Sequence, residues 1–245
     1  MNRPTFCQLI DKNKSLLEIG PYASPQFKKP DYQVYYADVC TVEQIKANCS
    51  QYGYNPELAP DHIDIPIDLN KTPSYQTDMR FEQIFSSHVI EHQPDLILHL
   101  QEVSNLVFSK QTQYFLAIPD KRYCFDHFQN ESTIAEVIGA HLERRRKLLP
   151  SSLLQTEIFR AHWNTYEHWN GNHGDISISI EKIKEFIGMA KKLETEFIDN
   201  HAWYFTPESF QTIIDLTYQL ELQPWQIKHI WQTEYSSNEF FAILH

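Results

Sequence analysis

The chain has 245 residues, 42% of them hydrophobic and 22% charged, and its formal net charge is −11. This composition suits one globular domain with a sizeable core, excludes a disordered chain, and disfavours a protein that grips nucleic-acid phosphates. No apolar run approaches the roughly 18 residues of a membrane-spanning helix, and the N-terminus lacks the apolar centre of a signal peptide, so we expect a cytoplasmic protein.

The first 120 residues alternate between strand-like and helix-like segments. Short apolar runs predict strands over residues 15–19, 33–36, 63–69, 81–85 and 113–118. A helix is expected over 41–52, where Thr41 and Gln44 have the spacing of a capping box, and another over 94–108. Strands separated by helices require crossover connections, and these predict a parallel sheet.

The second half of the chain begins with a segment poor in strand signals. We interpret residues 121–178 as a helical insertion, with a helix over 132–149 that carries the basic run 144–147 on a solvated face; docking of an anionic partner is the alternative for that run. Helices over 179–194 and 207–220 and strands over 226–234 and 239–244 then close a single domain, 1–245, whose first part is 1–120 and whose last part is 179–245.

A turn at Gly20 and Pro21 follows the first expected strand. Glycine lets a backbone approach a ligand closely. Asp38 ends the second strand, 18 residues after Gly20, where an acid can accept hydrogen bonds from ribose hydroxyls. No second glycine follows within this turn, so an ordinary turn with a surface aspartate is the alternative.

The segment after the fourth strand carries two histidines. His88, Glu91 and His92 match the HxxEH string of inverted zinc proteases. Pro94 leaves room for barely one helical turn, so we expect no metal site. The segment is better interpreted as a loop at the carboxyl edge, where open α/β sheets bind ligands.

Two further segments carry polar candidates. Asp120 and Arg122 follow the fifth strand and can face the same edge, or pair with each other in a salt-bridged loop. His201 and Tyr204 precede a helix start at Thr206 and can reach a substrate, with packing as the alternative.

These motifs, in this order, resemble class I S-adenosylmethionine (SAM)-dependent methyltransferases of the UbiE-like group, also called methyltransferase type 11. Glu18-Ile19-Gly20 resembles the first motif, residues 81–92 the fourth-strand signature with its Glu-His pair, and 115–120 the fifth strand. The strings SSHVIEHQPDLILHL, AIPDKRYCFDHF and HAWYFTPESF are similar to a bacterial branch associated with polysaccharide and glycosyltransferase genes. The resemblance covers residues 15–128 and 199–212, and it departs at 109–112, where the group usually has Lys-Pro-Gly-Gly.

The resemblance implies a Rossmann-like, doubly wound, mostly parallel seven-stranded sheet with an antiparallel terminal strand and a helical insertion after the fifth strand. It also implies SAM as cofactor, with Asp38 on the ribose and Asp68 near the adenine. The other implied cofactor contacts are Glu18, Gly20, Pro21, Ser86, Ser87 and His88.

Methyl transfer is a direct displacement in which the enzyme mainly positions the nucleophile. An oxygen nucleophile also benefits from a general base, for which we prefer His88 and His201 over His92. Asp120, Arg122 and Tyr204 are the expected substrate residues. We therefore expect O-methylation of a small molecule or a saccharide, as in polysaccharide biosynthesis, with no nucleic-acid partner and no membrane span.

Three alternatives stay open at this point. A catalytically inactive, methyltransferase-like accessory protein would explain the sparse glycines. A nicotinamide-dependent oxidoreductase would carry a GxGxxG string, which is absent. A zinc hydrolase would use His88, Glu91 and His92.

Overall fold

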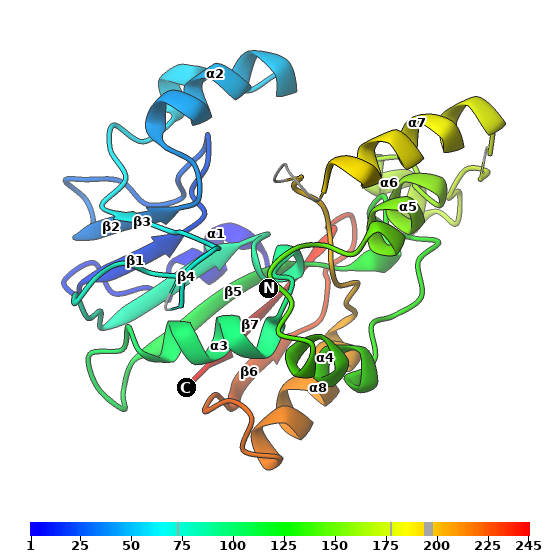
Figure 1. The fold of residues 1–245 in the computed structure, drawn as a ribbon. Coiled ribbons are helices and arrows are strands. Elements are labelled where there is room, and N and C mark those ends of the chain that lie inside the picture. The colour runs from blue at the N-terminus through cyan, green and yellow to red at the C-terminus, as the bar shows by residue number, and fades with distance from the viewer. Residues whose placement is uncertain (73, 177, 194–197) are drawn as a thin grey trace.

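The computed structural model describes the chain except for residues 73, 177 and 194–197. Its centre is one seven-stranded sheet in the order β3-β2-β1-β4-β5-β7-β6 (Figure 1). The strands are β1 (Leu16–Ile19), β2 (Val34–Asp38), β3 (Ile65–Pro66), β4 (Gln83–Ser87), β5 (Gln113–Pro119), β6 (Ile227–Trp231) and β7 (Glu239–Leu244). The last strand, β7, pairs antiparallel with β5 and β6, while β1 to β5 pair parallel. The expected mostly parallel, Rossmann-like sheet with an antiparallel terminal strand is confirmed.

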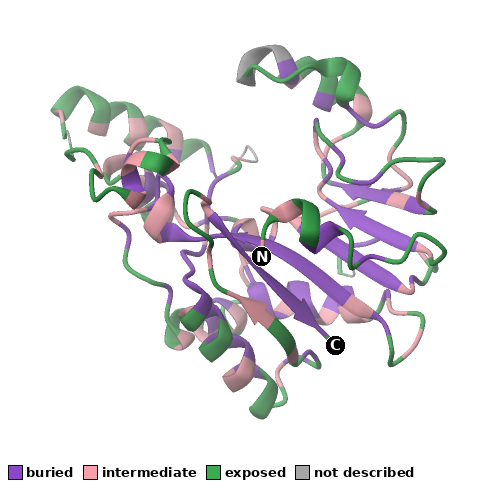
Figure 2. Ribbon diagram, turned by 180° about the vertical axis from the view of Figure 1, so that it is seen from behind, coloured by how far each residue is buried: buried purple, intermediate pink, exposed green. Residues whose placement is uncertain are grey.

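Both faces of the sheet are covered. On one face pack α3 (Leu96–Ser104), α4 (Ile134–Leu142) and α8 (Pro207–Gln219), which contribute Leu100, Val137 and Ile213 to the main core. On the other lies α1 (Arg3–Cys7), whose Phe6 packs on Phe115 and Phe241. Figure 2 shows the consequence: the central strands are mostly buried, whereas the outer strand β6 is partly exposed.

The crossover between β1 and β2 contains no helix. Residues 20–33 form a loop in which Phe27 is fully buried, with its ring 5.0 Å from that of Phe85 in an edge-to-face contact. The buried carboxylate of Glu18 accepts hydrogen bonds from the backbone amides of Gln26 (2.7 Å) and Phe27 (3.1 Å). These bonds hold the loop over the sheet in place of a packed helix.

Local signals set several element ends as expected. Helix α2 (Val42–Tyr52) begins with the expected capping box between Thr41 and Gln44, and Gly53 ends it in the left-handed conformation.

Two other elements are shorter than expected. The expected strand over 63–69 is only two residues long, since Pro66 cannot donate to a neighbouring strand. The helix expected to run to 149 ends at Leu142, and the basic run 144–147 lies in the connection to the next helix rather than on a helical face.

The helices after β5 are grouped differently from our expectation of an insertion over 121–178. α4 packs with α3 and α8 against the sheet, although we placed it in the insertion. α7 (Ile180–Lys192), which we placed with the closing elements, packs instead on α5 (Pro150–Ile158); its expected end at Glu194 lies outside the described residues. Leu148, Leu153, Ala190 and Leu193 form a small separate core there. We call α5, α6 (Thr165–Trp169) and α7 the cap.

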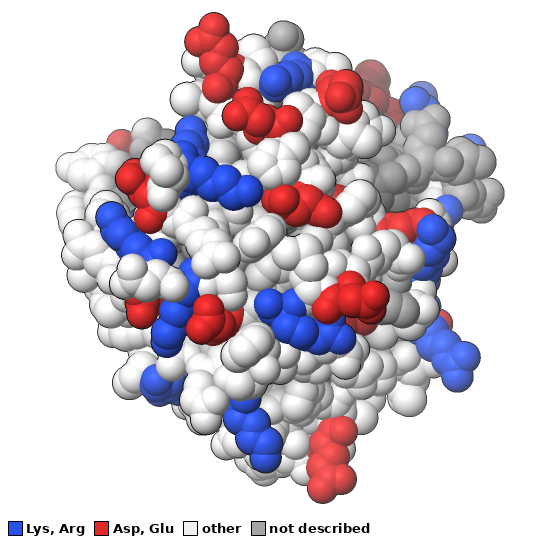
Figure 3. Space-filling model, turned by 90° about the vertical axis from the view of Figure 1, so that its left-hand side faces the viewer, with Lys and Arg blue, Asp and Glu red and all other residues white. Residues whose placement is uncertain are grey.

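The cap and α2 extend on opposite sides beyond the edge at which the parallel strands end (Figure 1). On the face that Figure 3 shows, acidic and basic side chains are interspersed and neither sign dominates. Within the described ranges, no helix has both the length and the apolar character needed to cross a bilayer.

Candidate functional site

The strand order creates a topological switch point between β1 and β4. The chain leaves β1 toward β2 on one side and later returns to β4 on the other, so the order of strands reverses at this point. In open α/β sheets, ligands bind outside the carboxyl ends of the strands at such a switch point. Gly20, Asp38 and His88 each follow or end one of these strands.

Gly20 closes the turn after β1 against the loop after β4. Its φ is +66°, in the left-handed region, and its amide donates to the carbonyl oxygen of Ala37 (2.8 Å). A Cβ atom at this position would lie 2.5 Å from Cγ2 of Val89. The space beside Gly20 is therefore filled by Val89, and the glycine is required by packing as well as by backbone conformation.

Asp38 ties the turn after β1 to the end of β2. Its carboxylate is almost completely buried and accepts from the amides of Cys40 (2.8 Å) and Tyr22 (3.2 Å). Burial raises the pKa of Asp38, against the opposing effect of these amides. Because an ionised carboxylate has about four lone-pair sites, Asp38 keeps acceptor capacity for the hydroxyl groups of a ligand.

Asp68 and Pro21 lie on either side of Asp38. Asp68 follows β3, is partly exposed, and accepts from the Asn70 amide (3.0 Å) and from Lys71 (3.2 Å). The hydrogen bond from the Asn70 amide and, to a smaller extent, the one from Lys71 lower the pKa of the Asp68 carboxyl. Pro21 is buried in the turn after β1. A contact of either residue with a cofactor stays a prediction, as does one of Glu18, whose two oxygens already hold the loop.

Ser86 is placed unlike its neighbour Ser87. The Ser86 hydroxyl shares a hydrogen bond with the hydroxyl of Tyr114 (2.8 Å), which in turn contacts His99 (3.2 Å). This chain of polar groups is buried between the sheet and α3, and burial lowers the pKa of His99 to about 3. The Ser86 side chain thus points into the core, whereas Ser87 and His88 are partly exposed at the sheet edge.

Beside this position lies a group of residues that we call the histidine–carboxylate cluster. Its members come from four separate segments: His88, Glu91, His92, Asp126, Asp199, His201 and Glu239. At its centre is Glu91, which is completely buried. Glu91 Oε1 lies 3.8 Å from His88 Nδ1, 3.5 Å from His92 Nε2 and 3.8 Å from His201 Nε2.

Each of the three histidines turns its second nitrogen to another carboxylate. The distances are 3.1 Å from His88 Nε2 to Glu239, 2.8 Å from His92 Nδ1 to Asp199, and 2.6 Å from His201 Nδ1 to Asp126. Glu239 is also bound by Arg3, whose Nε donates to Oε1 over 2.9 Å. Every ring is therefore held between two carboxylates.

The charges of the cluster follow from these contacts. Burial opposes ionisation of Glu91, but His92, His201 and His88 outweigh it and lower the pKa of this carboxyl. Burial likewise disfavours a charged His92, yet Asp199 and Glu91 raise its pKa to about 10. These shifts favour an ionised Glu91 and a protonated His92, and a protonated ring is a poor general base.

His201 and His88, the two predicted bases, lie together in this cluster. If His201 Nδ1–H donates to Asp126, its Nε2 carries a lone pair, as in the Asp–His pair of serine hydrolases. Likewise, if His88 Nε2–H donates to Glu239, the Nδ1 of His88 carries a lone pair. The two differ in access, since the side chain of His88 is 33% exposed and that of His201 only 8%.

Backbone geometry fixes the cluster. His88 is left-handed (φ 53°), and only the single 3-10 turn η2 (Ile90–His92) follows it, so the HxxEH string does not lie on one face of a helix. The carbonyl of Glu91 accepts from the amides of Ala202 (2.7 Å) and Trp203 (3.0 Å). These bonds hold residues 199–203 against η2.

The three predicted substrate residues are engaged elsewhere. Arg122 donates two hydrogen bonds to the buried carboxylate of Asp120, with Nε 2.9 Å and Nη2 2.6 Å from its oxygens, which is the salt-bridged loop that we gave as the alternative. The hydroxyl of Tyr204 contacts Thr156 Oγ1 (2.5 Å) on α5, and burial raises its pKa to about 12. Substrate binding by these residues stays a prediction, and these contacts count against it.

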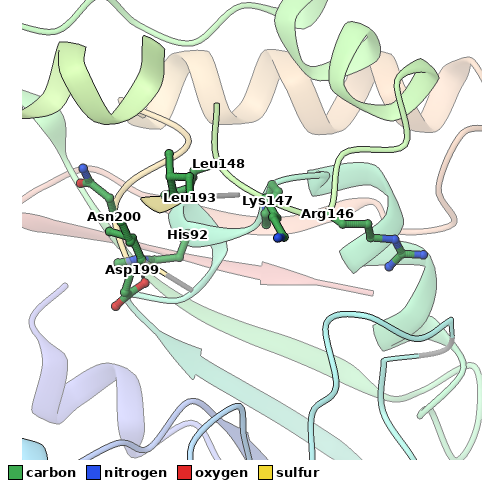
Figure 4. A pocket seen from close by; sticks show the side chains of 9 residues that line it. His92, Arg146, Lys147, Leu148, Leu193, Asp199 and Asn200 are labelled. Atoms are coloured by element: carbon green, nitrogen blue, oxygen red, sulfur yellow. Dashed lines mark ion pairs between the residues drawn. The ribbon is translucent and has the colours of Figure 1, made fainter. Parts of the chain in front are cut away.

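A small hollow opens beside the cluster. In Figure 4 the ion pair between His92 and Asp199 forms one wall, Leu148 and Leu193 of the small core lie next to it, and Arg146 points away. Sequence reasoning missed Asp126, Asp199 and Glu239. Asp126 lies within a string that we quoted for the resemblance, whereas nothing near Glu239 marks it as a partner of His88.

No protein-family model matches the chain, and no curated protein matches it. Among solved structures, a protein of Rhodobacter sphaeroides provisionally named a Zn-dependent alcohol dehydrogenase is 11% identical, with a TM-score of 0.50 over 98% of this chain and 87% of that one. A SAM-dependent methyltransferase from Mesorhizobium loti is 11% identical (TM-score 0.47, 98% and 95% covered). The CcbJ methyltransferase of Streptomyces caelestis is 8% identical (TM-score 0.47, 98% and 86% covered). At 11% identity, the first likeness shows the fold alone.

Proposed function

We propose that this protein is a SAM-dependent methyltransferase that methylates a hydroxyl group of a saccharide or another small molecule. The observation that carries the proposal is the contact between Gly20 and Val89. It joins the turn after β1, with Asp38 at its side, to the loop that carries His88. A position for a ribose-containing ligand and a candidate base thereby lie next to each other at the switch point of the sheet.

The residues at this edge fit SAM. Asp38 offers acceptor lone pairs to ribose hydroxyls, as acids at this position do in dinucleotide sites. The cluster places Glu91, Asp126, Asp199 and Glu239 in one region, and such a carboxylate-rich region suits a sulfonium cation. When bound, SAM supplies an activated methyl group.

The chain's own residues then position the acceptor and move a proton. We assign the role of base to His88, because it is the more exposed of the two candidates and directly precedes Val89. Glu239 holds its Nε2, which leaves Nδ1 to accept the proton of a hydroxyl. The protonated His92 keeps Glu91 ionised at the centre of the cluster.

One observation favours the inactive accessory protein as second candidate. The β1–β2 crossover has no helix, and the carboxylates of both Glu18 and Asp38 already accept hydrogen bonds from loop amides. Such a site would bind a nucleoside ligand without supporting turnover. Measurement of binding and of transfer in the same preparation distinguishes the two candidates.

The test is a calorimetric titration with S-adenosylhomocysteine. We expect micromolar binding, and a loss of at least about tenfold in Asp38→Ala, since a hydrogen bond to a charged group contributes about 1.5–3 kcal/mol. Asp64→Ala is the matched control, because Asp64 also accepts a backbone amide, that of Tyr36 (2.8 Å), but it precedes β3 instead of ending β2.

Absence of binding to the wild-type protein would refute the proposal. Equal loss in both variants would show that Asp38 acts through folding alone. Binding without transfer of a labelled methyl group to any acceptor in a panel of mono- and oligosaccharides would favour the accessory protein.

A further inference from the structure

A second group of histidines lies at the junction of the cap and the loop after β5. His127 follows η3 (Lys121–Tyr123), His168 is on α6, and His173 is in the turn after α6. Each offers a ring nitrogen, and these three atoms lie within 4.8 Å of one another. No residue of this group belongs to the histidine–carboxylate cluster.

Backbone carbonyls determine which nitrogens carry protons. His127 Nδ1 lies 2.8 Å from the carbonyl oxygen of Arg122, and His168 Nε2 lies 3.0 Å from that of His162. A carbonyl only accepts, so both nitrogens are donors. In the neutral rings, Nε2 of His127 and Nδ1 of His168 therefore present lone pairs.

This pattern is the one that metal-ligating histidines show. Such a histidine almost always donates its other N–H to a carbonyl or carboxylate, which fixes the tautomer. His168 Nδ1 also lies 3.0 Å from His173 Nδ1, close to the roughly 3.3 Å between ligand atoms that a tetrahedral ion with about 2.05 Å bonds requires.

The third ring has room to adjust. His127 and His173 are stacked, with centroids 3.6 Å apart, so their lone pairs converge on an ion only after one ring turns. His173 sits between Gly171 and Gly174, both with positive φ, and among the described residues its hydrogen bond is the one to His168. A rotation of this side chain would complete the set.

We propose that His127, His168 and His173 bind one Zn²⁺ ion, with water in the fourth position. Three neutral nitrogen donors and no thiolate are a set that zinc accepts in tetrahedral geometry. The ion would link the loop after β5 to α6 at a place where Tyr123 and Trp169 already stack at 3.8 Å. Since Asp126 directly precedes His127, the site also stabilises the loop that orients His201.

The experiment uses the whole chain, stripped with a chelator and then dialysed against zinc, with bound metal measured by mass spectrometry. Cobalt substitution, followed by visible absorption, reports the coordination geometry. We expect one equivalent of zinc per chain, a four-coordinate cobalt spectrum, and a melting temperature that zinc raises by several degrees. His173→Ala and His127→Gln should each lose the metal and this shift.

Two controls keep the site assignment separate. The ring of His162 lies 4.2 Å from that of His168, but its nitrogens already bind the carbonyl of Asn172 and the amide of Asn164, so His162→Gln should keep the zinc. His92→Gln should also keep it. Absence of zinc in the wild-type protein, retention in His173→Ala, or loss caused by His92→Gln would each overturn the proposal. A melting curve of every variant in chelator shows that it is folded.

Discussion

Substitution of Gly20 tests the contact between the turn after β1 and the loop after β4, which meet at the proposed site. In Gly20→Ala, the new methyl group would lie 2.5 Å from Cγ2 of Val89, on a backbone with φ +66°. The left-handed conformation costs alanine about 1–2 kcal/mol, and overpacking adds about 1–3 kcal/mol. The free energy of unfolding should therefore fall by about 2–5 kcal/mol.

A second substitution separates these two contributions. Val89→Ala removes Cγ2 but leaves Cβ, which lies at an ordinary 3.8 Å. In that background, Gly20→Ala should cost only the conformational part, about 1–2 kcal/mol. Urea denaturation of the four proteins gives the coupling energy. An equal cost of Gly20→Ala in both backgrounds would show that the turn and the loop are not in contact, and this would remove the observation on which the function is proposed.

Three further predictions concern buried polar groups. Burial raises the pKa of Glu18 to about 7, so ionisation of this carboxyl opposes folding. The free energy of unfolding of the wild type should therefore fall between pH 4.5 and 7. In Glu18→Gln this fall should be absent, as urea titrations at each pH would show. The pKa of His92 is raised to about 10, so its ion pairs stabilise the fold fully below pH 6.5, and this stabilisation is lost as the pH rises through 10. The difference in unfolding free energy between wild type and His92→Gln should therefore shrink between pH 7 and 10. A constant difference would contradict the ion pairs. Trp203→Phe leaves the carbonyl of Gln93 without its 2.6 Å donor and should cost about 1–3 kcal/mol in thermal unfolding, whereas an unchanged melting temperature would show that this bond contributes nothing.

Local patterns in the sequence were enough for much of the sheet. The capping box of Thr41 and Gln44 involves residues three positions apart, and the end of β2 at Asp38 follows from a short apolar run. Gly20 was correctly placed in a turn, but the sequence contains no sign that Val89 fills the space beside it. That contact joins residues 69 positions apart and exists only after folding.

The site was predicted less completely because polar partners are chosen by tertiary structure. The role of His88 and His201 as bases stays a prediction, and the carboxylates that hold these two rings, Glu239 and Asp126, lie 151 and 75 positions away in the sequence. The hydroxyl of Ser86 faces a buried tyrosine on the next strand instead of the sheet edge, and strand alternation without a known register does not specify the face.

A crystal structure of the protein soaked with S-adenosylhomocysteine would locate the cofactor site. We expect ligand density outside the carboxyl ends of β1, β2 and β4, with the ribose hydroxyls on the carboxylate of Asp38 and the sulfur facing His88. Density at any other place, or none at a ligand concentration that saturates binding in solution, would contradict this expectation.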